Sequence, residues 1–186
     1  MRRLMIIRIG KVKVKFDYIS IAFLALCSIV FSERFTACVL CAAIHEAGHA
    51  VTLLHFGCDS LELRLRLLCV DMMDNGRTKR SPAEHALCIL AGPLMNFLCI
   101  PLFWLLFDRF DKAIFMQCAQ SSAALGIFNM LPFVSTDGGE LLEMLLMKLM
   151  PPQRAQRIVE IITAAVIAAA AAAVAITMLN RISLGL

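Results

Sequence analysis

The sequence lacks the features of a nucleic-acid-binding, secreted or disulfide-stabilised protein. Its net charge is only +4 at pH 7, and no basic face carries the interleaved aromatic side chains that bind nucleic acid. The apolar run in MRRLMIIRIG is interrupted by Arg8, and no small-residue cleavage site follows, so we expect no cleaved signal peptide. Most of the eight cysteines lie in apolar runs, including the C-x-x-C pair Cys38 and Cys41. We interpret them as reduced, small apolar side chains in helices rather than disulfides or a zinc knuckle.

An excess of apolar residues indicates a membrane protein. Hydrophobic residues make up 60% of the chain and the mean hydropathy is +0.80, whereas a soluble domain is roughly 45–50% apolar. The length of 186 residues is enough for one domain and short for two. We therefore expect residues 1–186 to form a single membrane-embedded domain that is all-α and polytopic.

About six hydrophobic segments follow one another, and the fifth is short and amphipathic. The first is short for a membrane span, and residues 32–34 are interpreted as a tight connection to the second. Gly57 suits a helix C-cap after the second segment. The stretch Ser81-Pro82-Ala83-Glu84 predicts a capped start of the third helix, in which Pro93 predicts a kink. The segments are 18–31, 35–56, 86–107, 113–131, 140–150 and 158–179.

Two stretches with alternating apolar and charged residues predict a small β element at the membrane surface. Within residues 5–16, apolar residues alternate with basic ones, which favours a strand or short hairpin. Within residues 61–67, leucines alternate strictly with charged residues, which predicts a strand. Asp74-Asn75-Gly76 is a turn signal. The 61–67 strand is either a half-buried surface ribbon or an open edge that pairs with an extended substrate.

The positive charges predict the orientation of the chain. Basic residues cluster at the N-terminus and between Arg64 and Arg80, as in loops held on the cytoplasmic side. If the N-terminus is cytoplasmic, the second segment returns to the cytoplasm and brings Arg64, Arg66, Arg77, Lys79 and Arg80 there. The β element and the C-terminal end of the fourth segment then lie at the cytoplasmic membrane face.

The motif His45-Glu46-Ala47-Gly48-His49 is the strongest chemical signal. Residues four apart share one face of a helix, so His45 and His49 are able to hold one metal ion, with Glu46 placed to take a proton from a water. Ionisable side chains within an apolar segment indicate a functional site. A hydrolytic zinc site needs a third protein ligand, which must come from elsewhere.

Several residues are candidates for the third ligand. His55 has the metzincin spacing from His45, but Thr52 stands where that pattern needs a glycine to turn the chain, so we expect His55 to lie at the helix end. Three other candidates have a structural explanation. His85 lies in the first turn of a predicted helix, Glu62 lies on a predicted strand, and Glu84 belongs to the predicted capping box. Asp137 is the better candidate, because it lies in a loop and is followed by two glycines that let backbone approach closely.

Three motifs follow one another along the chain: HEAGH at 45–49, AGPLMN at 91–96 and NMLPFVSTDGG at 129–139. Their joint occurrence in this order resembles the site-2 protease family of intramembrane zinc metalloproteases (peptidase family M50). The compact chain with a basic N-terminal strand is similar to the bacterial stage IV sporulation FB protease branch. The resemblance implies an integral protein of the bacterial cytoplasmic membrane, and the positive charges predict that its N-terminus lies in the cytoplasm. We expect neither the nucleotide-sensing CBS domain that some relatives carry nor the PDZ domain of others.

The resemblance also implies the roles of individual residues. His45, His49 and Asp137 correspond to the ligands of one zinc ion per chain, and Glu46 to the general base and acid. Asn129 and Pro132 fall where the family places groups near the substrate or oxyanion, and Asn96 falls in a position with a polar or helix-breaking role. Thr136 replaces an expected leucine and Glu140 an expected basic or helix-starting residue, so the substrate contacts of this loop stay open.

The implied function is hydrolysis of a peptide bond within or near the transmembrane segment of a membrane-tethered protein, with zinc activating the water. The expected partners are this membrane-spanning substrate, the lipid bilayer and a membrane regulatory protein, without nucleic acid. The alternative is a polytopic protein without proteolysis, such as a metal transporter or an assembly partner. A transporter is expected to line a path with polar residues from several spans, whereas the acids and imidazoles here concentrate in one site.

Overall fold

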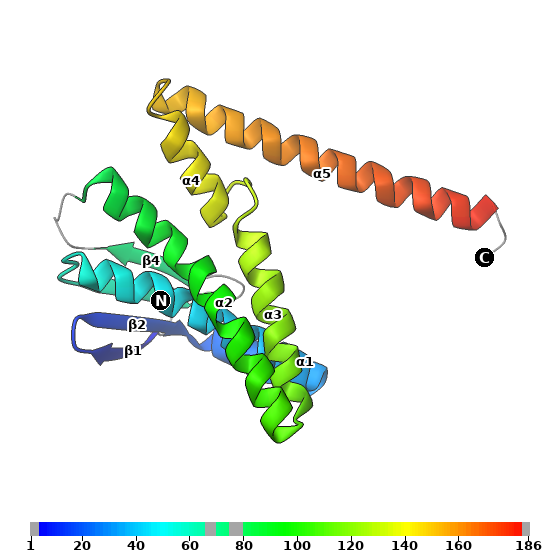
Figure 1. The fold of residues 1–186 in the computed structure, drawn as a ribbon, viewed down its shortest axis with the longest axis horizontal. Coiled ribbons are helices and arrows are strands. Elements are labelled where there is room, and N and C mark those ends of the chain that lie inside the picture. The colour runs from blue at the N-terminus through cyan, green and yellow to red at the C-terminus, as the bar shows by residue number, and fades with distance from the viewer. Residues whose placement is uncertain (1–3, 66–69, 75–79, 184–186) are drawn as a thin grey trace. The chain divides into compact units, whose positions relative to one another are not determined.

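The computed structural model describes residues 4–65, 70–74 and 80–183, and it is mostly helical (Figure 1). The chain divides into two compact units, Met1–Phe128 and Asn129–Leu186. The first unit holds a small sheet and three helices, and the second holds two further helices. The predicted all-α architecture with a small β element is therefore confirmed, while the expectation of a single domain stays a prediction.

The sheet has four strands in the order β1-β2-β3-β4. The alternating stretch at 5–16 forms the predicted hairpin, with β1 (Leu4–Ile9) and β2 (Val12–Asp17) antiparallel around Gly10, whose φ of +58° suits glycine. The strand predicted at 61–67 is β3 (Leu61–Leu65) as far as the structure describes it. It pairs in parallel with β2 and antiparallel with β4 (Val70–Asp74).

Because β3 is flanked on both sides, the hypothesis that it is an open edge for an extended substrate is wrong. The physical reason is a long-range pairing with β2 that the alternation of apolar residues does not encode. Several residues used in the sequence predictions lie outside the described residues: Arg66, Leu67, Cys69, Asn75, Gly76, Arg77 and Lys79.

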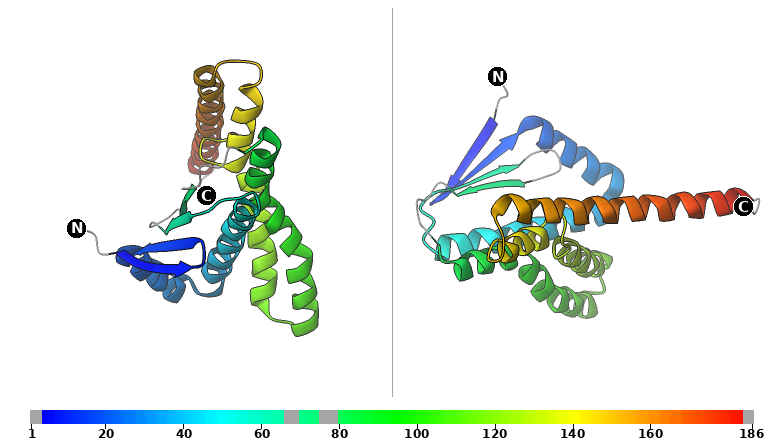
Figure 2. Two further views of the ribbon diagram at one scale, coloured as in Figure 1. Left: turned by 90° about the vertical axis from the view of Figure 1, so that its left-hand side faces the viewer. Right: turned by 90° about the horizontal axis from the view of Figure 1, so that it is seen from above.

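Helix α1 (Tyr18–His55) joins β2 to β3 and has 38 residues. The predicted non-helical connection at 32–34 is wrong, because this stretch stays helical. A straight helix of this length would extend about 57 Å, yet the parallel register returns the chain to Leu61 beside Val12. Helix α1 therefore turns back, and Figure 2 shows its blue first part and cyan second part running in different directions. Gly57, with φ of +86°, follows the helix end as predicted.

Helices α2 (Pro82–Phe110) and α3 (Ala113–Asn129) complete the first unit. The predicted capping box is confirmed: the Ser81 hydroxyl accepts from the Glu84 N–H, and the Glu84 carboxylate accepts from the Ser81 N–H. Helix α2 continues through Pro93, and the kink there stays a prediction. A buried cluster of small and aromatic side chains packs the three helices together: Ala37, Cys41, Phe103, Cys118 and Ala119.

The second unit consists of a loop followed by α4 (Asp137–Leu146) and α5 (Pro152–Ser183). The backbone N–H of Val134 in the loop donates to the Thr163 hydroxyl of α5 at 2.9 Å. Helix α4 begins earlier than the predicted 140, because Thr136 caps it. Helix α5 begins at Pro152, a residue type that suits the first turn of a helix.

Three helical stretches within the described residues are long and apolar enough to cross a membrane: Glu33–His55, Pro82–Phe110 and Pro152–Met178. Tyr18–Cys27 is a shorter apolar stretch. The structure thus supports an integral membrane protein, but the predicted number of six segments is not confirmed.

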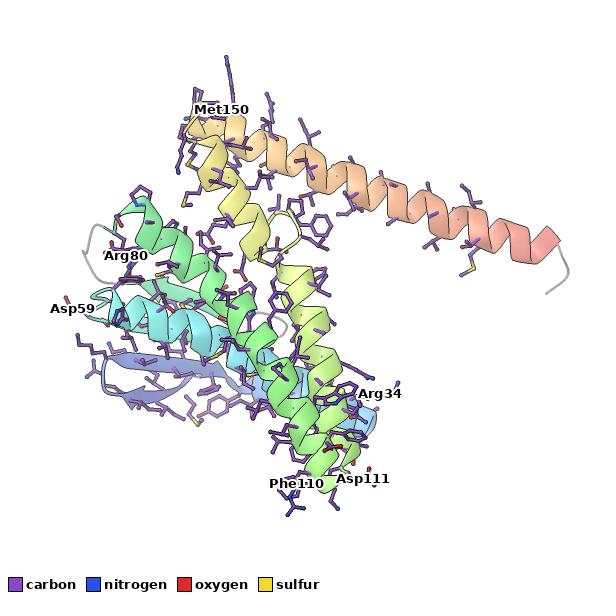
Figure 3. All side chains as sticks on the ribbon, in the orientation of Figure 1. Arg34, Asp59, Arg80, Phe110, Asp111 and Met150 are labelled. Atoms are coloured by element: carbon purple, nitrogen blue, oxygen red, sulfur yellow. The ribbon has the colours of Figure 1, made fainter. Side chains whose placement is uncertain are left out.

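A polar cluster on the sheet links the end of β4 to the start of α2. The Asp74 carboxylate accepts hydrogen bonds from the Cys58 thiol, at 2.9 Å, and from the Arg80 guanidinium, and both charged side chains are mostly buried. Figure 3 labels Arg80 beside the start of α2. Burial raises the pKa of the Cys58 thiol, and the neighbouring Asp74 raises it further, so the neutral thiol is the donor. The ion pair fixes α2 to the sheet.

We predict that Asp74→Ala lowers the free energy of unfolding by about 3 kcal/mol, because it leaves the buried Arg80 charge uncompensated. Asp59→Ala is the matched control, since Asp59 pairs with Lys11 on the exposed surface and contributes little. Denaturant unfolding in detergent, followed by circular dichroism, measures both. Equal stability of the two variants would contradict this account of the cluster.

Candidate metal centre

His45 and His49 are brought together on α1 as the four-residue spacing predicts. Their Nε2 atoms are 3.1 Å apart, and His45 is only 6% exposed. Two nitrogen ligands about 2.0–2.1 Å from one tetrahedral zinc ion are separated by about 3.3 Å. The spacing of the two imidazoles therefore fits a shared ion without a change of the helix.

The hydrogen bond of His49 to α2 selects the tautomer that a metal requires. Nδ1 of His49 lies 2.8 Å from the backbone carbonyl oxygen of Cys88, which only accepts hydrogen bonds. The proton is therefore on Nδ1, and the lone pair of Nε2 is directed towards His45. Such a backbone partner behind a histidine is a regular feature of metal sites.

Asn96 holds His45 from the other side. Its side chain is fully buried on α2, and Nδ2 lies 3.2 Å from Nδ1 of His45. A half turn of the carboxamide presents Oδ1 instead, which accepts the Nδ1 proton and leaves Nε2 of His45 for a metal. Oδ1 has no hydrogen-bond partner in the described part of the chain. The side chain of Asn96 therefore contacts His45, the first histidine of the motif.

Gly92 of α2 provides the space in front of the two imidazoles. A methyl group at Gly92 would lie 2.7 Å from Nε2 of His45 and closer still to Nε2 of His49. At Gly48, a methyl group would lie 2.6 Å from the carbonyl oxygen of Ala91, so glycine is needed for the close approach of α1 and α2. Gly92 therefore keeps open the position that an ion between the two nitrogens would occupy.

The first unit also holds the other residues considered as ligands in its sequence, and Glu46. His55 is exposed at the end of α1 and stacks edge-on against Phe56, and His85 is exposed in the first turn of α2. Glu62 forms ion pairs with Lys15 and Arg64, which hold the pKa of its carboxyl below the usual range. Glu46 follows His45 on α1 and is half-buried.

In the second unit, Asp137 is the first residue of α4. Its position at a helix N-terminus favours a carboxylate. The preceding Thr136 is buried and donates to the carbonyl oxygen of Leu131, at 2.6 Å, while it accepts from the N–H of Gly139. A methyl group at Gly139 would overlap the carbonyl oxygen of Phe133, so the loop requires the second glycine.

Asn129 and Pro132 are half-buried at the end of α3 and in the loop that follows. Asp137 lines a cavity of about 270 Å³ within the second unit. Three acids and several loop and helix residues line it: Val134, Ser135, Thr136, Asp137, Gly139, Glu140, Glu143, Gln156 and Val159.

Sequence reasoning missed three contributors. Cys88 acts through its backbone carbonyl, so no side-chain signal exists for it. Gly92 was visible in the A-G-P motif, but its contact with the imidazoles depends on the packing of α1 against α2. Thr136 was noted as a departure from the family, and its capping role is explained by its place before the first turn of α4.

Replacing Gly92 by alanine is predicted to abolish zinc retention, because the methyl group enters the space between the two Nε2 atoms. Gly126→Ala is the control, since the three atoms nearest to a methyl group there belong to the ring of Phe97 rather than to an imidazole. Zinc content after purification in detergent, measured by plasma emission, compares them. A Gly92→Ala protein with wild-type zinc content would refute this assignment.

Asn96→Leu is predicted to weaken zinc affinity by about 10- to 100-fold, because His45 loses the group that sets its tautomer. Asn96→Asp keeps an acceptor oxygen and should retain more zinc than Asn96→Leu. Competition with a chromophoric chelator measures both affinities. If Asn96→Leu binds zinc as tightly as the wild type, Asn96 does not position His45.

Two comparisons with known proteins found a match. The family model described as Peptidase family M50 matches residues 109–170, which include Asp137 and Asn129 but not the motif at 45–49. The structure is similar to the site-2 protease from Methanocaldococcus jannaschii, with a TM-score of 0.64 and 20% sequence identity, over 84% of this chain and 78% of that chain.

No curated protein matches the chain by sequence. The comparisons agree with the resemblance inferred from the three motifs, and they do not distinguish the sporulation FB branch. The chain therefore shares the fold of a site-2 protease, and its residues 109–170 match peptidase family M50.

Proposed function

We propose that this chain is an intramembrane zinc metalloprotease that hydrolyses a peptide bond within or near the transmembrane segment of a membrane-tethered protein. The observation that carries the proposal is the pair of facing Nε2 atoms on an apolar helix, with the His49 proton fixed on Nδ1 by Cys88. The match to peptidase family M50 supports it independently.

Asp137 is proposed as the third ligand of a single zinc ion held with His45 and His49. Two imidazoles and one carboxylate form a donor set typical of hydrolytic zinc sites, which keep a fourth position for water. Its place in the first turn of α4 supports an ionised carboxylate, and the cap of Thr136 fixes the loop that presents it.

Zinc, when bound, would supply Lewis-acid activation of a water and of the scissile carbonyl. Glu46, next to His45, takes the proton of the attacking water and passes it to the leaving amine. Asn129 is proposed to donate a hydrogen bond to the oxyanion, and Pro132 to shape the loop beside the substrate. Asn96 is assigned to His45 rather than to the substrate, because it is fully buried against that imidazole.

The substrate must present an extended segment, because a transmembrane helix keeps its carbonyls in hydrogen bonds. A metal transporter remains the rival function. A transporter would carry zinc into vesicles whether or not Glu46 is present. The following experiment therefore also measures zinc uptake.

We predict that Glu46→Gln retains zinc and reduces cleavage of a single-span substrate in proteoliposomes by about 10²- to 10⁴-fold, because proton transfer is lost. Asp137→Asn is predicted to lose zinc and cleavage together. The matched control is Glu160→Gln, on the exposed surface of α5. Unaltered cleavage by Glu46→Gln would refute the proposal, as would zinc uptake into the vesicles with no cleavage of any substrate.

A further inference from the structure

The four-stranded sheet has one apolar and one charged face. Side chains alternate along a strand, and the registers place paired residues on the same face. Among the described residues of the apolar face, Asp74 alone is charged, and its carboxylate is paired with Arg80. Ten apolar residues make up the rest of this face as far as its side chains are described: Met5, Ile7, Ile9, Val12, Val14, Phe16, Leu61, Leu63, Leu65 and Met72.

Helix α1 covers only part of this apolar face. Its last turns pack Ala50, Leu53 and Leu54 into a cluster with residues of β2, β3 and β4. These turns end the candidate membrane span Glu33–His55, so this part of the sheet lies at the end of the span. The same face continues onto β1, where Met5, Ile7 and Ile9 are 39%, 41% and 68% exposed as far as the chain is described.

The opposite face of the hairpin carries cations that the described chain does not neutralise. Arg8 lies directly opposite Lys13 across the β1–β2 pair, an arrangement of like charges that is unfavourable by itself. Neither has an ion-pair partner among the described residues, whereas Lys15 and Arg64 share Glu62 and Lys11 pairs with Asp59. The acids Asp17 and Asp71 also lie on this face.

We propose that the β1–β2 hairpin lies in the surface of an anionic bilayer. Met5, Ile7 and Ile9 enter the boundary between headgroups and acyl chains, and Arg8 and Lys13 extend along the surface to lipid phosphates. An amphipathic element of this kind binds through apolar area together with attraction to anionic lipid. The unpaired Arg8 and Lys13 favour a phosphate-rich surface over a second protein, and the inference does not depend on peptide hydrolysis.

The test places a single tryptophan on either face of β1. Ile7→Trp and Ile6→Trp are made in a Trp104→Phe background, because Trp104 is the chain's one tryptophan. Ile6 is the matched control, since it is the adjacent exposed residue on the charged face. The full-length proteins are reconstituted in vesicles with phosphatidylcholine brominated on its acyl chains, and bromine quenching is recorded. If Ile7→Trp does not fold, by circular dichroism, Ile9→Trp replaces it.

The tryptophan at position 7 should be quenched at least about twice as strongly as that at position 6, because only the apolar face reaches the acyl chains. Equal quenching would overturn the proposal. So would a tryptophan at position 7 that is shielded from aqueous acrylamide but not quenched by bromine, since a protein partner would then cover the strand.

The role of charge is tested by lipid composition. Replacing half of the phosphatidylcholine by phosphatidylglycerol should increase quenching at position 7 at low ionic strength, and about 1 M salt should remove the increase by screening. The increase should also be lost in Arg8→Gln/Lys13→Gln but kept in Lys11→Gln, whose charge already pairs with Asp59. If the quenching at position 7 is the same with and without phosphatidylglycerol, the assignment to anionic lipid is overturned.

Discussion

The candidate site depends on the close packing of α1 against α2. It places the Cys88 carbonyl 2.8 Å from Nδ1 of His49 and Asn96 3.2 Å from Nδ1 of His45. These contacts are made by α2, while both histidines belong to α1. The glycines at 48 and 92 allow the two helices to approach to this distance. A helix surface without them would hold two imidazoles, but their Nε2 lone pairs would not be directed at a common point with room for an ion.

The sheet gives this helix pair a fixed base. Strands β2 and β3 pair in parallel on either side of α1 in the sequence, which makes α1 the crossover between them. The buried ion pair of Arg80 with Asp74 then ties the start of α2 to the same sheet. The two helices that carry the site are thus both anchored at one end of their candidate spans, α1 at its C-terminal end and α2 at its N-terminal end.

The sequence was informative where a local pattern decides the outcome. Four-residue spacing predicted the histidine pair, alternation predicted the hairpin, and Ser81 with Glu84 predicted the start of α2. It failed where distant residues decide. The central position of β3 comes from pairing with Val12 and its neighbours, far away in the chain. The partner of Asn96 and the role of Gly92 follow from helix packing, which no single segment specifies. Asp137 was selected for its place in a loop before two glycines, the resemblance of motifs supports it, and its ligand role stays a prediction.

X-ray absorption at the zinc edge of the purified protein tests the central claim most directly. The account predicts one zinc per chain with a shell of nitrogen and oxygen atoms at about 2.0–2.1 Å, including the outer scattering of two imidazoles. Replacing His49 by glutamine should reduce that imidazole scattering to one ring. A sulfur shell at about 2.3 Å would assign the metal to cysteines instead and contradict the proposed centre.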